Sequence, residues 1–187
     1  MPFLFMKGIV MAKKKKSNTQ WLITITILAF CISFIFSLIS EITLSKVNLI
    51  IGIIILILFI GIGIIFDMIG VAVTSTTESP LNAMSSKKIK GAKKAVTFKK
   101  NADRVSSFCN DVIGDICGII SGSAGVTITA TIANTYNLNI FWIGLVITAI
   151  IAALTIGGKA LCKGIAMKNS NQIVYLTAKV ISIFEKK

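Results

Sequence analysis

The chain has 187 residues, of which 55% are hydrophobic, and a formal net charge of +13. Its mean hydropathy of +0.86 is too high for a soluble domain, so the composition indicates an integral membrane protein with room for one compact bundle. The sequence has no histidine, which argues against common catalytic pairs and ordinary zinc sites, and its basic blocks lack the interleaved aromatics of a nucleic-acid interface. We therefore expect neither an enzyme nor a nucleic-acid-binding protein.

Residues 1–20 form a basic N-terminal segment with lysines at positions 13–16. Met11, directly before this block, is an alternative translation start to Met1. The apolar run that follows the lysines is too long for the core of a cleavable signal peptide, and no small-residue cleavage site follows it.

Four apolar runs are long enough to cross a bilayer as helices: residues 21–40, 49–73, 107–133 and 138–161. The first is an extra span that precedes a transmembrane domain over 49–187. The predicted fold class is an all-α integral membrane protein with four transmembrane helices, whose first partner is the lipid bilayer.

Charge in the linkers predicts the orientation. Basic residues precede the first span, fill the linker between the second and third spans, and follow the fourth span, whereas the segment 134–139 carries no charge. Because positively charged loops stay in the cytoplasm, we expect a multi-pass protein of the plasma membrane with both termini inside.

Two segments outside the spans have amphipathic patterns. Apolar residues alternate with lysines over 81–100, which predicts a basic helix on the inner membrane surface or, alternatively, a solvated linker. Ile173, Leu176, Val180 and Phe184 fall at helical spacing, so 172–184 is expected to be a C-terminal surface helix.

Four of the seven acidic residues lie within or at the edges of apolar runs: Asp67, Glu78, Asp111 and Asp115. A carboxylate at the centre of a membrane helix costs about 2.5–3.5 kcal/mol on insertion scales. Their concentration there suggests cation binding or proton transfer.

In the third span, polar and small residues fall within an arc of roughly 140° at 100° per residue. A face of small residues lets two helix backbones approach, so one interpretation is a packing seam. Asp111 and Asp115 add another, because neighbouring carboxylates in a low dielectric share a proton or hold a cation. The residues of this arc are Asn110, Asp111, Gly114, Asp115, Gly118, Ser121, Gly122 and Gly125.

The second span shows a similar face with Gly63, Asp67, Gly70, Thr74 and Glu78, although Glu78 is also explained as an interfacial charge beside Pro80. In the fourth span Lys159 either extends toward the cytoplasm or reaches one of the acidic residues. All these groups belong to the cytoplasmic halves of their spans, so they are expected to meet in one inward-facing cavity.

Carboxylate, hydroxyl and amide oxygens are ligands that Mg²⁺ prefers, and they also serve Na⁺ or H⁺. The predicted metal ligands are Ser75, Glu78, Asn110, Asp111 and Asp115.

Over about residues 65–180 the chain resembles the transmembrane domain of the cyclin-M/CorB magnesium (and cobalt) transporter family. Ser75-Thr-Thr-Glu-Ser-Pro-Leu-Asn-Ala-Met is similar to its F-S-x-x-E-x-A-L motif, and Phe108-Cys-Asn-Asp-Val-Ile-Gly-Asp is similar to its I-G-N-x-L-x-N helix. Further similarities are Lys90-Gly91-Ala92, Asn101 with Asp103 and Arg104, and Gly158-Lys-Ala-Leu-Cys-Lys followed by Ile165-Ala-Met-Lys-Asn.

The resemblance implies a dimer, here through the glycine-rich helix 114–122, and an inward-facing acidic Mg²⁺ cavity to which Ser75, Glu78 and Asn110 contribute. The chain departs from the family pattern at Cys109, Gly114, Lys159 and Cys162. Within these 187 residues we expect no counterpart of the family's cytoplasmic regulatory domains. Lys159 stands where the family has a glutamate.

Three functions follow from these observations. The first is a membrane protein that binds or transports a divalent cation, most plausibly Mg²⁺. The second is a non-transporting partner or regulator of another membrane protein, in which Lys159 neutralises the acidic cluster. The third is a transporter coupled to a monovalent ion or a proton.

Overall fold

The fold is all-α, as predicted. The structure is a computed structural model that describes residues 22–40, 42 and 48–184, so the predicted N-terminal segment 1–20 lies outside the described residues. Its helices are Leu22–Ser40, α2 (Leu49–Ser75), α3 (Glu78–Ser86), α4 (Ala92–Lys100), α5 (Ala102–Ser107), the π-helix η1 (Phe108–Gly114), α6 (Asp115–Tyr136), α7 (Ile140–Lys168) and α8 (Ser170–Phe184).

Among the described residues, four helices are long and apolar enough to cross a membrane: Leu22–Ser40, Leu49–Ser75, Ala102–Tyr136 and Ile140–Lys168. They match the four predicted spans except at two ends: Trp21 is not described, and residues 138–139 precede the fourth helix. The third is longer than predicted, because α5, η1 and α6 follow one another without a break and begin before the apolar run.

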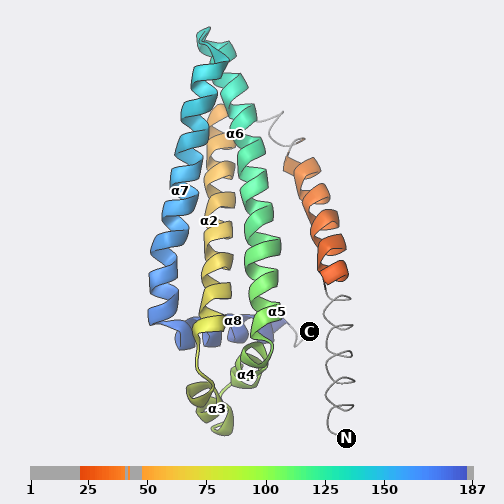
Figure 1. Cartoon of the computed structure of the whole chain (residues 1–187), viewed down its shortest axis with the longest axis vertical. Coiled ribbons are helices and arrows are strands. Elements are labelled where there is room, and N and C mark those ends of the chain that lie inside the picture. The colour runs from red at the N-terminus through yellow and green to blue at the C-terminus, as the bar shows by residue number, and fades with distance from the viewer. Residues whose placement is uncertain (1–21, 41, 43–47, 185–187) are drawn as a thin grey trace, which may run out of the picture.

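Helices α2, α6 and α7 run side by side, and the Leu22–Ser40 helix lies beside α6 (Figure 1). Helix α8 crosses one end of the bundle, with α3 and α4 beyond it; we call this end the base. At the opposite end α6 and α7 are joined by a short turn that has Asn137 in the left-handed conformation (φ 52°). Asn139 caps α7 there by accepting a hydrogen bond from the Phe141 N–H at 3.0 Å.

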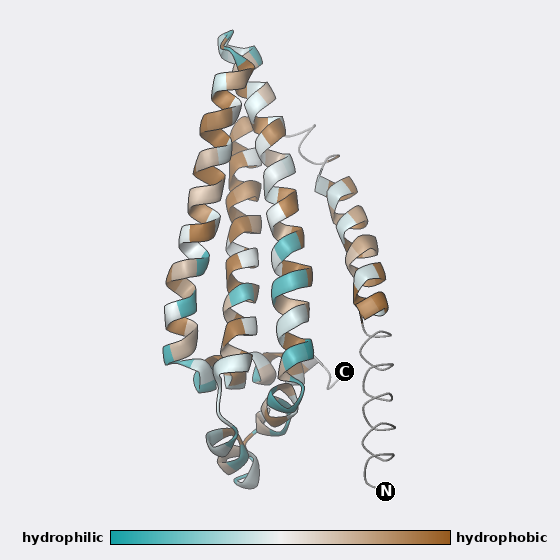
Figure 2. Ribbon diagram, viewed as in Figure 1, coloured by the Kyte–Doolittle hydropathy of each residue, from teal (hydrophilic) through white to brown (hydrophobic). Residues whose placement is uncertain are grey.

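Aliphatic side chains fill the contacts among the long helices. Leu56 and Ile60 of α2 pack against Ala124 and Ile128 of α6. A second cluster, Val112, Ile116 and Ile120, faces Ile25, Ala29 and Ile32 of the Leu22–Ser40 helix. Large aliphatic residues cover the outer surfaces of these helices, as expected of a bundle surrounded by lipid (Figure 2).

The base differs from the prediction in one respect. The segment 81–100 is two short helices, α3 and α4, rather than one. Lys88 (φ 55°) and Gly91 (φ 87°) both adopt the left-handed conformation, which ends one helix and redirects the chain into the next. The C-terminal surface helix is confirmed as α8.

Two contacts fasten the base to the end of α2. The Lys99 ammonium donates to the Thr74 carbonyl at 2.9 Å and approaches the Val73 carbonyl at 3.5 Å, which satisfies acceptors left free at the helix end. The Asn171 side-chain oxygen of α8 accepts hydrogen bonds from the Thr76 hydroxyl and from the Thr77 N–H. The α2–α3 corner is therefore held from both α4 and α8.

Candidate functional site: a charged centre in the helix bundle

An ion pair joins the two central helices α2 and α7. Lys159 Nζ lies 3.5 Å from Asp67 Oδ1, with 28% and 20% of the two side chains exposed. A methyl group added at Gly114 would lie 3.8 Å from the same lysine nitrogen, so the ammonium is next to η1 as well. Lys159 is therefore directed to an acidic residue, one of the two alternatives left open by the sequence.

Glycines bring the three helices together around this pair. A Cβ atom at Gly63 of α2 would lie 3.0 Å from Cys117 Cβ of α6, and one at Gly158 of α7 would overlap the Ile64 side chain. Small residues at such positions allow close backbone approach between membrane helices. The hydrophilic bands on α2, α6 and α7 consequently share the half of the bundle nearer the base (Figure 2).

Asn110 is inserted between η1 and α2. A Cβ atom at Gly70 would overlap its side-chain amide, so the absence of a side chain at Gly70 creates the space that Asn110 fills. The Asn110 nitrogen donates to Ser106 Oγ at 3.4 Å, whereas its oxygen is buried and has no hydrogen-bond partner among the described residues. An unsatisfied buried acceptor is costly, and it is available to a cation or a donor.

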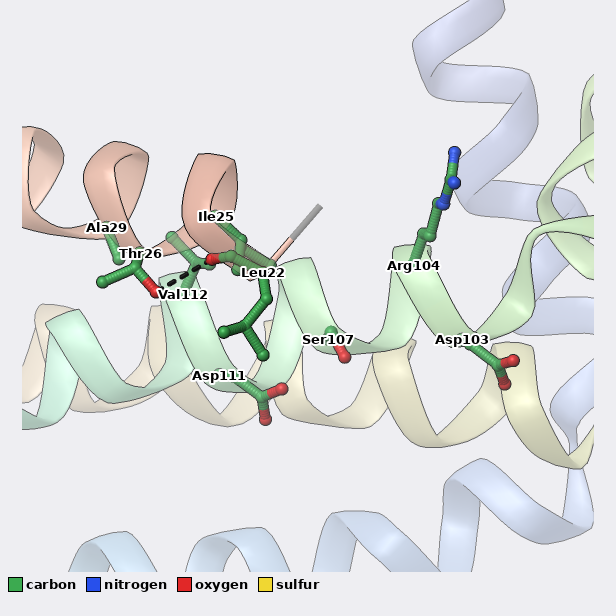
Figure 3. A pocket seen from close by; sticks show the side chains of 9 residues that line it. All are labelled: Leu22, Ile25, Thr26, Ala29, Asp103, Arg104, Ser107, Asp111 and Val112. Carbon is green, nitrogen blue, oxygen red and sulfur yellow. Dashed lines mark hydrogen bonds between the residues drawn. The ribbon is translucent and has the colours of Figure 1, made fainter. Parts of the chain in front are cut away.

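The π-helix η1 affects which residues of the third span share a face. A π-helix has more residues per turn than an α-helix, so a four-residue step rotates less far around the axis. Asp103, Ser107 and Asp111 point to the same side of the helix, whereas Arg104 points to another side (Figure 3). A π-helical segment is not visible in residue spacing, and the sequence prediction assumed 100° per residue throughout.

The predicted polar arc of the third span is divided between two environments. Gly114, Ser121 and Gly125 are buried inside the bundle. Asp111, Asp115, Gly118 and Gly122 are exposed on the outside. A Cβ atom at Gly118 or Gly122 would meet nothing within 4 Å in the described part of the chain. The arc is wider than the part of the helix surface that α2 and α7 cover. Asp111 and Asp115 therefore lie on the uncovered part of the arc.

Glu78 is not on the face of the second span, and that prediction is wrong. Helix α2 ends at Ser75, the backbone is extended at Thr76 and Thr77, and Glu78 is an exposed residue in the first turn of α3. An acidic residue at a helix N-terminus interacts favourably with the helix dipole, in keeping with the interfacial alternative. Ser75 is exposed at the end of α2.

The predicted metal ligands thus occupy three places: Ser75 and Glu78 at the α2–α3 corner, Asn110 against α2, and Asp111 with Asp115 on the outside. Within residues 22–40, 42 and 48–184, no group of three or more His, Cys, Asp or Glu side chains is arranged to hold a metal ion. A single chain in this conformation does not bring the set together for Mg²⁺, and the metal site stays a prediction.

Sequence reasoning identified Asp67 and Lys159 as notable but did not pair them. A usable signal was their position: each lies a little over two helical turns from the basal end of its helix. Helices α2 and α7 both run toward the base, so residues at equal distances from their C-terminal ends lie at a similar depth (Figure 1).

No family model, curated protein or solved structure matches the chain. The similarity to the cyclin-M/CorB family therefore remains a resemblance carried by the motifs alone.

Proposed function

We propose that this chain is a non-transporting multi-pass membrane protein that acts as a partner or regulator of another membrane protein. The observation that carries the proposal is the contact between Lys159 Nζ and Asp67 Oδ1 at 3.5 Å. The charge of the bundle centre is balanced by a covalently attached ammonium group, which occupies the position that a free cation would need.

The energetics of membrane charges support this role. An ionised group inside the bilayer requires a partner, and removing one member of a buried pair leaves an uncompensated charge. A tethered ammonium cannot leave, whereas a transported ion must bind and dissociate. If a mobile cation bound Asp67 in place of Lys159, the lysine ammonium would lose its carboxylate partner and remain as an unpaired charge.

The orientation belongs to the same proposal. Lysines are concentrated in the basal elements, with Lys99 on α4 and Lys168 at the end of α7, while the α6–α7 turn carries no charge. By the positive-inside rule the base faces the cytoplasm. Residence in the plasma membrane is part of the same proposal.

The outer surface of α6 supports association with another membrane helix. Asp115, Gly118 and Gly122 are exposed on it, and the glycines offer space for close approach. Lipid chains are a poor environment for Asp115, so a covering helix would lower its cost. The homodimer through 114–122 remains our proposal for one such assembly.

A second candidate function is binding or transport of Mg²⁺. It is favoured by the buried, unpartnered oxygen of Asn110, one of the residues to which the family resemblance assigns a ligand role. The two functions differ in what Lys159 does: it blocks a site in the first and would have to be displaced in the second.

The test is a thermal unfolding and calorimetric titration of the purified chain with Mg²⁺. The parent is expected to show neither a shift of its unfolding midpoint nor binding heat, and Lys159→Glu is expected to gain both. Lys163→Glu, on the same helix but exposed, is the matched control and should gain neither. Mg²⁺ binding by the parent that is lost in the Asp111→Asn, Asp115→Asn double variant would establish the second candidate instead.

A further inference from the structure

A cavity of about 620 Å³ lies between the beginning of the Leu22–Ser40 helix and the α5–η1 segment (Figure 3). It is outside the Lys159–Asp67 centre, and neither of those residues lines it. Its size is within the range of small-molecule sites, roughly 300–1,000 Å³.

One wall of the cavity is acidic. Asp103, Ser107 and Asp111 line it at four-residue intervals and project from the same side of the helix (Figure 3). The two carboxylates are eight residues apart on the helix, with the serine hydroxyl between them. Arg104 also lines the cavity, but its side chain leaves the helix in another direction from the two carboxylates (Figure 3).

The other wall is mainly apolar. Leu22, Ile25 and Ala29 line it from the first helix together with Thr26, whose hydroxyl donates to the Leu22 carbonyl, and Val112 adds an aliphatic side chain from η1. Asp103 is near the base and Val112 is deeper in a membrane-spanning helix, so the cavity changes from acidic to apolar along the bundle axis. An occupant that matches both walls has a cationic head directed to the base and an apolar tail directed into the bilayer.

We propose that this cavity binds an amphipathic ammonium ion, with the head on the wall that carries Asp103, Ser107 and Asp111 and the tail against Leu22, Ile25 and Ala29. The ammonium group donates a hydrogen bond to one of the two carboxylates, and its charge offsets part of the acidic charge of this wall. The tail covers aliphatic side chains and adds hydrophobic free energy. The source is either a single-chain cationic amphiphile or an aminophospholipid of the adjacent leaflet.

The test uses dodecylammonium as the probe and the full chain in nanodiscs of phosphatidylcholine. Isothermal titration should give saturable binding, which the Asp103→Asn, Asp111→Asn double variant weakens at least tenfold. Asp115→Asn, with the same charge change on an exposed residue that does not line the cavity, is the matched control and should bind like the parent. Dodecanol, which has the same tail without the charge, should not bind saturably.

A steric variant separates occupancy of the cavity from surface attraction. Thr26 lines the cavity and is exposed, so Thr26→Phe places a ring in this space and should abolish probe binding while the unfolding midpoint is retained. Equal binding by the double variant and the parent, equal binding of dodecanol, or unchanged binding by Thr26→Phe each overturns the proposal.

Two further experiments distinguish an aminophospholipid, a single-chain cation and the chain's own N-terminal segment as occupants of the cavity. Replacing part of the phosphatidylcholine with phosphatidylethanolamine lowers the apparent affinity for the probe if an aminophospholipid occupies the cavity, and leaves it unchanged if a single-chain cation does. The lysines at 13–16 precede Leu22 closely in sequence. If their replacement by glutamine tightens probe binding, the cavity belongs to the chain's own N-terminal segment and the proposal fails.

Discussion

At the scale of single residues, Lys159 and Asp67 each lower the free-energy cost of placing the other's charge inside the membrane. Lys159→Met should lower the free energy of unfolding by about 3 kcal/mol, the lower end of the range for breaking a buried pair, because it leaves Asp67 uncompensated. Asp67→Asn should have a similar effect. The double variant should lose less than the sum of the two single losses. A thermal unfolding cycle in detergent measures this coupling, and additive losses would show that the two groups do not interact.

Asn110 and Gly70 form a second residue pair, in which the Asn110 side chain occupies the space left by the absent side chain at Gly70. Gly70→Ala should destabilise the protein, because the new Cβ overlaps the Asn110 amide. Asn110→Ala removes the amide and with it an unsatisfied buried oxygen. In the double variant the alanine at position 70 should therefore be tolerated. Measured unfolding midpoints check this compensation, and a double variant less stable than Gly70→Ala alone would contradict it.

At the scale of elements, the glycines of α6 separate internal packing from packing with a partner. Gly125 is buried, and a Cβ there would overlap Ile151 of α7, so Gly125→Val should destabilise the folded chain. Gly118 and Gly122 face open space, so valine at both positions should leave stability unchanged and weaken self-association. Energy transfer between labelled copies in liposomes measures the association. Unchanged association in the Gly118→Val, Gly122→Val double variant would contradict a dimer through 114–122.

Some of the helices could be predicted from the sequence and others could not. Long apolar runs predicted all four spans, since bilayer thickness fixes a minimum length that few other structures need. The break between α3 and α4 was missed because it depends on the conformations of Lys88 and Gly91, and lysine gives no sign of a positive φ. The π-helical turn was missed for a similar reason: hydrogen-bond register depends on neighbouring packing and not on residue type.

The candidate site was predicted less completely than the fold. The sequence singled out acidic residues in apolar runs. The direction of each side chain depends on contacts between helices, and the residue pattern of one helix does not contain these contacts. Asp111 and Asp115 could be placed on the arc of small residues, yet the arc is wider than the buried contact, and they fall outside it. Lys159 had two possible directions, and the glycine contacts of α2 with its neighbours determine which one it takes.

At the scale of the whole molecule, the two ends of the bundle have opposite chemical character. The base carries the lysines of α4 and of the α3–α4 connection and the amphipathic α8, and the opposite end is the uncharged α6–α7 turn around Asn137. Because lysine-rich ends are retained in the cytoplasm, the whole bundle is expected to have one orientation.

This orientation predicts opposite labelling of two exposed positions. In intact cells Asn137→Cys should react with a membrane-impermeant maleimide, and Lys88→Cys should react only after the membrane is permeabilised. The parent is the control for its four cysteines. Cys31 is on an apolar helix, Cys109 and Cys117 are buried and Cys162 is half-buried on α7, so all four should react slowly from either side. Labelling of Lys88→Cys in intact cells would reverse the orientation. The acidic wall of Asp103 and Asp111 would then face the outside, and any amphipathic cation would have to enter from that leaflet.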